Sequence, residues 1–563
     1  MSTSAADSQI QERAFSERRL GLLILENKDG AALSAGIPHF QAAIAAWKQL
    51  NWPTRVAEIQ LDLALLHRKA GNRADAAKIA NEAFHAFAGA NDERAIDAGI
   101  QAGAMLTELS RATEAQALLE RTAAIADEKN DHLKLAGVRL ELARALIATG
   151  DAPAALATVR QAEATFASFK RRGEVARCQE IFADAHTIAG DGAAAAAAYE
   201  SAIAIYGDLG RPVETGEVLA RFSEWHRDRG DLAASESALD RLLGLYTQTG
   251  KHQLVAQTLR RLGTVHAKRG EPVKAEERYR RSLELCRNLG DQEGLSRTLY
   301  LLGAADLRAG RADEGLAKLQ ESLVAAEAID LPILLEPVLA AIARVHRSRG
   351  EHDAAVAVMQ KWVAVLKQQG DRADALVVLG SIAEVYQDKG AWDEAEAHLQ
   401  RLVRVTGTPA DRDLHARTLR QLAGIEARRG AWSEARAHLT EAIEALGTMT
   451  DETRAALSAQ LGHVCLQQAD AIIKRGDDRR IASGSHPDCL LAAVDHLEVA
   501  ERLLRAAHDE PARARVLVDL GNAKALLGRL REAKSAFDQA ADACESQGDV
   551  RATQLIRRAT LKL

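Results

Sequence analysis

Five histidines occupy the same position of a repeating sequence pattern, and they are the residues most able to bind a metal ion. They are His67, His186, His226, His266 and His346, and the steps from His186 to His226 and from His226 to His266 are forty residues each. Zinc needs ligands that converge to about 2.0–2.1 Å from one ion. Equivalent residues on stacked helices stand about 8–10 Å apart. The histidines are therefore interpreted as packing residues, and no metal site is predicted.

Other catalytic signatures do not occur in the sequence. It contains no G-x-x-x-x-G-K-[ST] phosphate loop, no H-E-x-x-H zinc motif and no G-x-S-x-G nucleophile elbow. The five cysteines (Cys178, Cys286, Cys465, Cys489 and Cys544) are odd in number and show no C-x-x-C spacing. This pattern argues against a disulfide framework and favours buried free thiols in a reducing compartment. The chain is predicted not to be an enzyme, with no catalytic residue and no cofactor.

The repeating pattern itself predicts the fold. Leu262-Gly263, Gly270 and Ala275 recur forty residues later as Leu302-Gly303, Gly310 and Gly315. A fixed period of about 20–50 residues is typical of a solenoid, in which each unit buries its apolar face only by stacking on its neighbours. Helix-forming residues dominate and apolar residues recur at spacings of three and four, so each unit is expected to be a helical hairpin. The predicted fold class is an all-α, right-handed superhelical solenoid of about 12–13 hairpins.

The pattern also predicts how the chain is organised. We expect an irregular N-terminal helical pair in residues 1–50, regular forty-residue repeats in 51–450, a repeat with an inserted loop at about 470–488 within 451–508, a last repeat in 509–548, and a capping helix in 549–563. Val550, Leu555 and Ile556 of that helix are expected to cover the last hairpin. Small residues such as Gly263 and Gly303 share one column, which indicates that two helices approach closely there.

The repeat resembles the tetratricopeptide repeat, whose pattern has Leu-Gly on the first helix and Ala and Tyr on the second. Leu262-Gly263, Gly270, Ala275 and Tyr279 stand at the matching spacing. The usual Trp is replaced by Leu, as at Leu259, and the closing Pro is missing. This forty-residue variety is similar to the repeats of the Pins/LGN polarity adaptors, kinesin light chains and the bacterial Rap and PlcR regulators. The resemblance implies a scaffold that binds a peptide or protein.

In the family that the chain resembles, the first helix of each hairpin lines a concave groove. The resemblance places a basic set of side chains there, namely Arg260, Lys268, Arg308, Arg344, Arg347, Arg420 and Arg428, extended by Arg297 and Arg417 one turn earlier. Earlier repeats place Glu180, Asp184, Glu224 and Asp228 on the same surface. The groove is thus expected to be acidic in the N-terminal half and basic after about residue 257. The alternative interpretation is an ordinary solvated charged face.

These observations predict a non-enzymatic adaptor that holds a segment of another protein, expected to be acidic, in its groove. Two alternatives remain open: a regulator that responds to a small peptide, as in the Rap and PlcR proteins, and a regulatory or substrate subunit of a separately encoded enzyme. A net charge of −6 argues against nucleic acid as a partner. No apolar run approaches 18 residues and the first residues lack a signal-peptide layout, so a cytoplasmic location away from membranes is expected.

Overall fold

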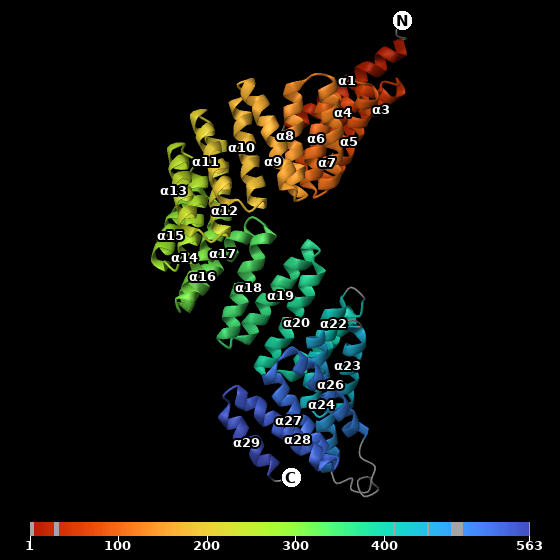
Figure 1. Ribbon diagram of the computed structural model, residues 1–563, viewed down its shortest axis with the longest axis vertical. Helices are drawn as coiled ribbons and strands as arrows, with labels where there is room; N and C mark the ends of the chain where they lie inside the picture. Colours follow the sequence, from red (N-terminus) through yellow and green to blue (C-terminus); the bar gives the residue numbers. More distant parts are fainter. Residues whose placement is uncertain (1–4, 27–32, 409–410, 447–449, 475–487, 562–563) are drawn as a thin grey trace. The chain divides into compact units, whose positions relative to one another are not determined.

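The computed structural model describes residues 5–26, 33–408, 411–446, 450–474 and 488–561, and these ranges contain α-helices and no strand (Figure 1). The chain forms two compact units, Met1–Leu285 and Cys286–Leu563. We call them unit 1 and unit 2. The predicted all-α repeat fold is confirmed.

In unit 1 the helices are α1 (Ala5–Glu26), α3 (Gly36–Gln49), α4 (Pro53–Lys69), α5 (Arg73–Gly89), α6 (Arg94–Glu108), α7 (Ala112–Glu128), α8 (His132–Ala148), α9 (Ala152–Ser168), α10 (Arg172–Ile188), α11 (Gly192–Asp208), α12 (Pro212–Asp228), α13 (Leu232–Gln248), α14 (His252–Lys268) and α15 (Pro272–Leu289), within which the division between the units falls.

In unit 2 the helices are α16 (Gln292–Arg308), α17 (Ala312–Glu327), α18 (Pro332–Ser348), α19 (His352–Gln369), α20 (Arg372–Lys389), α21 (Trp392–Thr406), α22 (Arg412–Arg428), α23 (Trp432–Leu446), α24 (Asp451–Lys474), α26 (Asp488–Ala507), α27 (Glu510–Leu526), α28 (Leu530–Ser546) and α29 (Val550–Thr560).

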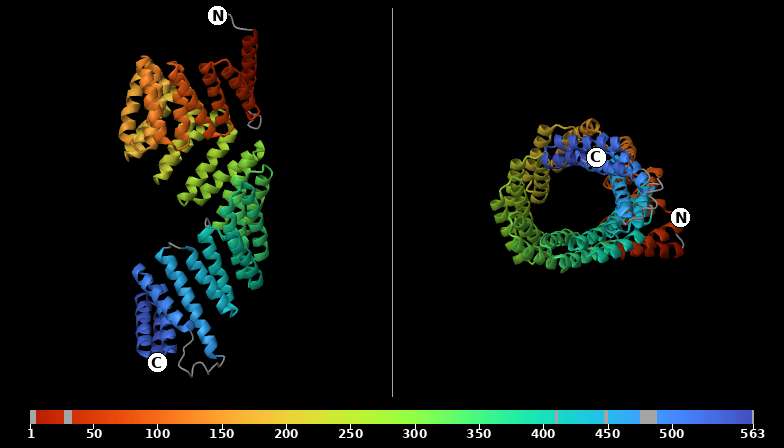
Figure 2. Two further views of the ribbon diagram at one scale, coloured as in Figure 1. Left: turned by 90° about the vertical axis from the view of Figure 1, so that its right-hand side faces the viewer. Right: turned by 90° about the horizontal axis from the view of Figure 1, so that it is seen from below.

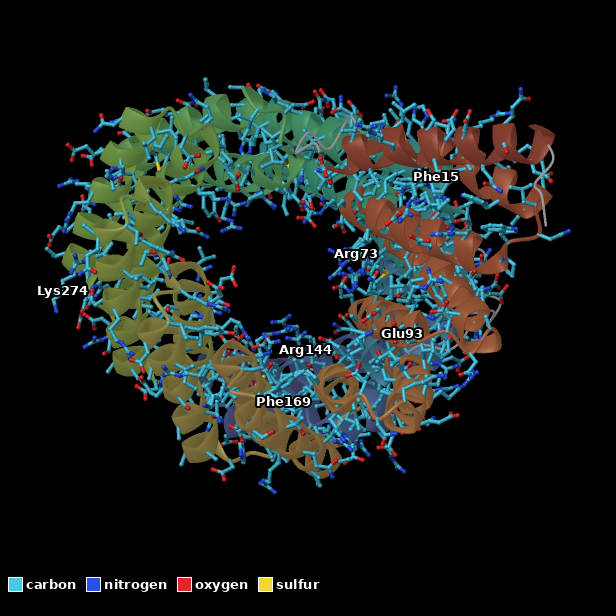
Figure 3. The ribbon with its side chains drawn as sticks, turned by 90° about the horizontal axis from the view of Figure 1, so that it is seen from above. Phe15, Arg73, Glu93, Arg144, Phe169 and Lys274 are labelled. Atoms are coloured by element: carbon cyan, nitrogen blue, oxygen red, sulfur yellow. The ribbon has the colours of Figure 1, made fainter. Side chains whose placement is uncertain are left out.

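Consecutive helices pair into antiparallel hairpins that stack side by side within each unit (Figure 2). We call the two members of a hairpin its first helix and its second helix. The closest contacts between helices that are not consecutive all join first helices: α1 with α4, α6 with α8, and α8 with α10 in unit 1, and α16 with α18, α20 with α22, and α24 with α27 in unit 2. The first helices therefore form the inner layer of each unit. In unit 1, Arg144 of first helix α8 lies on the inner side and Lys274 of second helix α15 lies on the outer side (Figure 3).

Left-handed residues end most of these helices. Among the described residues, glycine has this conformation at fifteen positions, for example at Gly150 with φ +84°, because it lacks the Cβ that makes the conformation costly for other residues. An Asp often follows and accepts the N–H of the residue three positions later, as Asp151 does from Ala154 at 3.0 Å. The glycine thus ends one helix and the following Asp caps the start of the next.

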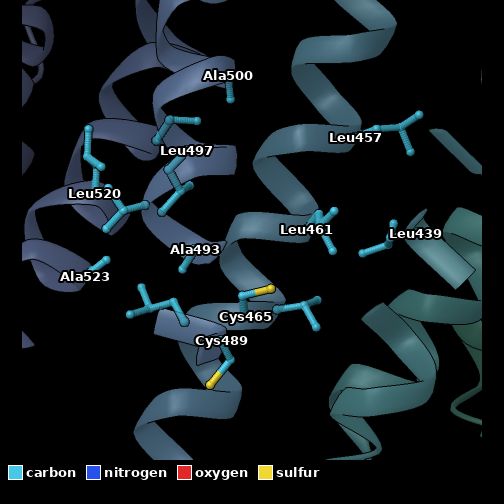
Figure 4. Close-up of a cluster of buried hydrophobic side chains, with 14 of the residues drawn as sticks. Leu439, Leu457, Leu461, Cys465, Cys489, Ala493, Leu497, Ala500, Leu520 and Ala523 are labelled. Carbon is cyan, nitrogen blue, oxygen red and sulfur yellow. The ribbon is translucent and has the colours of Figure 1, made fainter. Parts of the chain in front are cut away.

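Glycines of the predicted small-residue column stand where two helices of a hairpin meet. A Cβ added to Gly303 would lie 2.9 Å from the carbonyl oxygen of Gly315, and one added to Gly462 would lie 2.6 Å from Cγ of Leu497. Leu461 in turn lies between Leu439 of α23 and Leu497 of α26 (Figure 4). The close approach inferred from the sequence is confirmed.

The irregular repeat and the C-terminal helix differ in detail from expectation. Helix α24 runs to Lys474 and α26 begins at Asp488, so residues 470–474 of the predicted loop are helical. The remainder of that loop, residues 475–487, lies outside the described residues. In α29, Ile556 packs against the core as expected, but Val550 and Leu555 are 65% and 58% exposed. The expectation that these two residues cover the last hairpin was wrong, because the helix turns that side to solvent.

Candidate partner-binding surface

All nine residues of the predicted basic set lie on first helices. In unit 1, Arg260 and Lys268 belong to α14, and in unit 2 the other seven belong to α16 (Arg297 and Arg308), α18 (Arg344 and Arg347) and α22 (Arg417, Arg420 and Arg428). Arg260 is half-buried and the other eight are exposed. The inner layer of first helices thus carries the side chains that the resemblance assigned to it, but their local partners differ from one helix to the next.

Two carboxylates of the next first helix neutralise Arg347. Its Nε lies 2.7 Å from Asp388 and its Nη1 lies 3.2 Å from Glu384, and both acids belong to α20. Gln421 of α22 donates a further hydrogen bond to Glu384 at 3.2 Å. These acids occupy groove positions that the sequence interpretation had not counted, so the predicted basic surface is interrupted at α20.

Two further members of the set have partners close by. Arg297 donates to Glu293 of the same helix at 2.8 Å and 3.0 Å. Arg428 places its guanidinium 4.8 Å from the centre of the Trp392 ring, a distance at which a cation and an aromatic face attract each other. Arg297 is therefore paired within its own helix, and Arg428 contacts a ring of the preceding hairpin.

Four arginines of unit 2 remain open to a partner. Arg308 of α16, Arg344 of α18, and Arg417 and Arg420 of α22 are exposed, and within the described parts of the chain their guanidinium groups have no hydrogen bond or ion pair. We call them the open arginines. They retain their full donor capacity, since a guanidinium offers five N–H groups in a planar fork.

The acidic residues of unit 1 are not open in the same way. Arg221 of α12 binds Glu180 at 2.8 Å and Asp184 at 2.6 Å, and both acids lie on α10. Glu180 also accepts from the hydroxyl of Tyr206 at 2.8 Å. Burial together with the nearby Asp184 carboxylate raises the pKa of Tyr199 to about 12. Two members of the expected acidic surface, Glu180 and Asp184, thus belong to a hydrogen-bonded network around Arg221. The other two pair with different arginines, Glu224 with Arg261 at 3.0 Å and Asp228 with Arg227 at 2.9 Å.

Three of the five repeat histidines, His226, His266 and His346, contact carboxylates of their own hairpins, whereas the buried Nδ1 of His67 has no hydrogen-bond partner among the described residues. Nδ1 of His266 lies 2.9 Å from Glu271, and Nδ1 of His226 lies 3.5 Å from Asp231. In each case the acid stands five residues later, at the start of the second helix. Within the described residues, no group of three or more His, Cys, Asp or Glu side chains is arranged to hold a metal ion. These contacts support the interpretation of the histidines as packing residues.

None of the five cysteines forms a disulfide within the described residues, and four of the five are buried. Burial raises the pKa of the Cys178 thiol to about 12 and that of Cys465 to about 11. A thiol reacts as its thiolate, so these two side chains behave as small apolar residues at neutral pH.

Sequence comparisons agree with this architecture. Residues 214–288 and 371–447 match one sequence profile of the tetratricopeptide repeat, and residues 338–373 match a second. These three segments of the chain are therefore tetratricopeptide repeats, in which stacked hairpins form an extended surface. No curated protein matches its sequence. None of the described helices combines the length and apolar character that crossing a bilayer requires.

Several solved structures align with the chain. Aspartyl phosphate phosphatase F from Bacillus subtilis is 13% identical over 63% of this chain and 94% of its own, with a TM-score of 0.37. The apo form of RapI is 12% identical over 62% of this chain and 97% of its own, with a TM-score of 0.39. A putative kinesin light chain from Podosopora anserina, with nearly identical repeats, is 16% identical over 33% of this chain and 92% of its own, with a TM-score of 0.29.

Proposed function

We propose that this protein is a non-enzymatic scaffold that holds an acidic segment of another protein against the first helices of unit 2. The observation that carries the proposal is the presence of open arginines on three first helices, with Arg308 on α16, Arg344 on α18 and Arg420 on α22. Elsewhere on the inner layer, arginines such as Arg221 and Arg347 already bind carboxylates of the chain itself.

The chemistry of these side chains suits an extended acidic partner. Arginine binds a carboxylate through two parallel hydrogen bonds, which fixes geometry as well as charge. Each exposed pair contributes only about 0–1 kcal/mol, so recognition requires several pairs at once. Because exposed charges are screened by salt, we expect binding of the partner to weaken as ionic strength rises.

The decisive experiment reverses two open arginines while sparing the internal network. Arg308→Glu combined with Arg344→Glu removes two favourable pairs and introduces repulsion, with an expected loss of about 1–2 kcal/mol, or roughly tenfold in affinity. Arg347 is kept, because its loss would leave Glu384 and Asp388 unpaired. The measurement is quantitative mass spectrometry of proteins captured from native lysate by the immobilised chain at 0.1 M salt.

The matched control is Arg401→Glu combined with Arg404→Glu. These arginines lie on second helix α21, are exposed, and give the same change in net charge. Proteins that depend on the proposed surface should be lost with the first variant and retained with the control. Equal capture by the parent and both folded variants would contradict the proposal.

A further inference from the structure

A pocket of about 290 Å³ lies between helix α22 and the start of helix α24 in unit 2. Its lining residues are Asp413, Ala416, Arg417 and Arg420 from α22, and Leu446, Thr450, Thr453 and Leu457 from the end of α23 and the start of α24. Its size is near the lower end of ligand pockets, which run from about 300 to 1,000 Å³. It therefore suits a single side-chain head group better than a cofactor.

Helix periodicity places the polar groups on opposing walls. Arg417 and Arg420 share one face of α22 with Asp413 and Ala416, at spacings of three and four residues. Thr450, Thr453 and Leu457 follow the same spacings on the facing wall. Ala416 and Leu457 are buried, at 3% and 2% exposure, and supply an apolar base. Two arginines and two threonines thus line one small space.

Thr450 and Thr453, which line the pocket opposite α22, are hydrogen-bonded to each other. The two hydroxyls of Thr450 and Thr453 are 2.9 Å apart, and the backbone N–H of Thr453 donates to the Thr450 hydroxyl at 3.3 Å. This N–H of the first turn is therefore satisfied within the chain. The donors that the pocket offers to a ligand are chiefly the N–H groups of its two arginines.

Arg420 differs from Arg347 in the residues that the next first helix places beside it. Arg347 meets carboxylates 37 and 41 residues later, at Glu384 and Asp388. The residues 36, 37, 40 and 41 positions after Arg420 are Ala456, Leu457, Gln460 and Leu461. Asp413 is the single acid among the residues that line the pocket, so their formal charges sum to one positive. The pocket is thus a donor-rich site without an internal acceptor for both arginines.

We propose that this pocket binds one oxyanion, a carboxylate or a phosphate, carried by a side chain of the bound segment. This inference rests on the proposed function and specifies where one side chain of the bound segment is held. Two planar guanidinium forks supply more donors than a carboxylate has oxygens, whereas a phosphate adds a third oxygen and nearly a second charge. A phosphorylated residue is therefore expected to bind more tightly than a glutamate.

The test uses three blocked heptapeptides, Gly-Ser-Gly-X-Gly-Ser-Gly, in which X is phosphoserine, glutamate or serine. Phenylglyoxal modifies exposed arginines, and mass spectrometry of tryptic digests measures the rate at each site of the full-length protein. We expect the phosphoserine peptide to slow modification of Arg417 and Arg420 at least threefold, the glutamate peptide to slow it less, and the serine peptide to have no effect. The rates at Arg401 and Arg404 should stay constant.

A second measurement uses variants and a fluorescein-labelled phosphoserine peptide. Arg417→Gln combined with Arg420→Gln should weaken its binding at least fivefold, whereas Arg401→Gln combined with Arg404→Gln should not change it. The control pair has the same three-residue spacing and the same loss of charge. Protection that is absent, or equal at Arg401 and Arg404, would overturn the inference, and so would unchanged binding by the folded pocket variant.

The outcome for the pocket can be separated from the outcome for the proposed function. Arg308→Glu combined with Arg344→Glu leaves the pocket intact, so the phosphoserine peptide should still protect Arg417 and Arg420 in that variant. Failure of peptide protection together with loss of partner capture by that variant would reject the pocket alone. Peptide protection together with unchanged capture would reject the wider acidic-segment proposal.

Discussion

The guanidinium of Arg221 on α12 lies 2.6 Å from the carboxylate of Asp184 on α10, one hairpin earlier in unit 1. The same arginine binds Glu180, and its guanidinium carbon lies 5.9 Å from the centre of the Tyr199 ring. One side chain therefore neutralises two acids and joins two successive first helices, which makes this part of the inner layer a structural element and leaves less of it for a partner.

Replacing Arg221 should weaken unit 1 more than an exposed pair of similar spacing would. Arg221→Gln leaves Glu180 and Asp184 without their shared partner, and we expect a loss of about 1 kcal/mol, because the group is partly screened by solvent. The control is Arg241→Gln, which removes a pair with Glu200 at 2.6 Å in which both side chains are more than 40% exposed. Urea denaturation midpoints should fall for the first variant and scarcely for the second. Equal midpoints would contradict the prediction.

We expect the stability of unit 2 to fall at acid pH because of Asp306 of α16. Its side chain is 3% exposed and binds Arg311 and Lys318. Burial alone would raise the pKa of Asp306, but hydrogen bonds from Lys318 and Arg311 outweigh it and hold the pKa below its usual value. A lowered folded pKa gives stability that is present above the unfolded pKa, about 3.9, and is lost as pH falls through the folded value.

The matching variant is Asp306→Asn, with Asp313→Asn, 95% exposed, as its control. At pH 7 the first change should cost roughly 2 kcal/mol, since the charged donors Arg311 and Lys318 lose their buried, ionised acceptor. The difference from the parent should shrink below about pH 4. A difference that stays constant from pH 7 to pH 3 in denaturation experiments would rule out this role for the ionised carboxylate.

His463 should give the opposite pH dependence. Its Nδ1 lies 2.8 Å from Asp519, joining α24 to α27, and this hydrogen bond raises the pKa of His463. A raised folded pKa gives stability that is fully present below the unfolded value, about 6.5, and is lost as pH rises through the folded value. His463→Gln should therefore lower the thermal midpoint at pH 5.5 and leave it unchanged at pH 8.5. Because His463 is 47% exposed, the effect should stay below about 1 kcal/mol.

Two glycines in first helices should respond oppositely to alanine. In Gly303→Ala the new Cβ would meet the backbone of Gly315, which cannot move without displacing α17, so the melting temperature should fall. In Gly380→Ala the nearest atom, Cδ2 of Leu402, is 3.9 Å away. Alanine there should stabilise helix α20 by up to about 1 kcal/mol, through helix propensity. A stabilised Gly303→Ala variant would contradict the close approach of α16 and α17.

The sequence was sufficient to predict the hairpins, because their signals are local and repeated. The turn at Gly150, the cap at Asp151 and the close approach at Gly303 each depend on residues a few positions apart or on one column of the repeat.

The electrostatics of the inner layer could not be predicted from the same columns. Arg347 lies on a first helix as expected. Whether its guanidinium can bind a partner depends on Glu384 and Asp388, which lie 37 and 41 residues later in the sequence and pair with it. Arg221 stands at the same distances from Asp184 and Glu180. A comparison of charges at these two offsets would have revealed both networks. The pocket beside Arg417 depends on how α24 begins, which the repeat does not specify.

The left-handed turns also set an order in which hairpins of unit 1 open. Before residue 171, five turns place a residue other than glycine at positive φ (Asn51, Asn91, Ser110, Asn130 and Lys170) and two use glycine (Gly71 and Gly150), whereas the turns from Gly190 to Gly270 use glycine throughout. This conformation costs about 1–2 kcal/mol for residues other than Gly, Asn and Asp, so the cost falls chiefly on Ser110 and Lys170. Amide hydrogen exchange should accordingly be faster around the turns before residue 171 than around those after it, so unit 1 has a built-in gradient of local opening along its sequence.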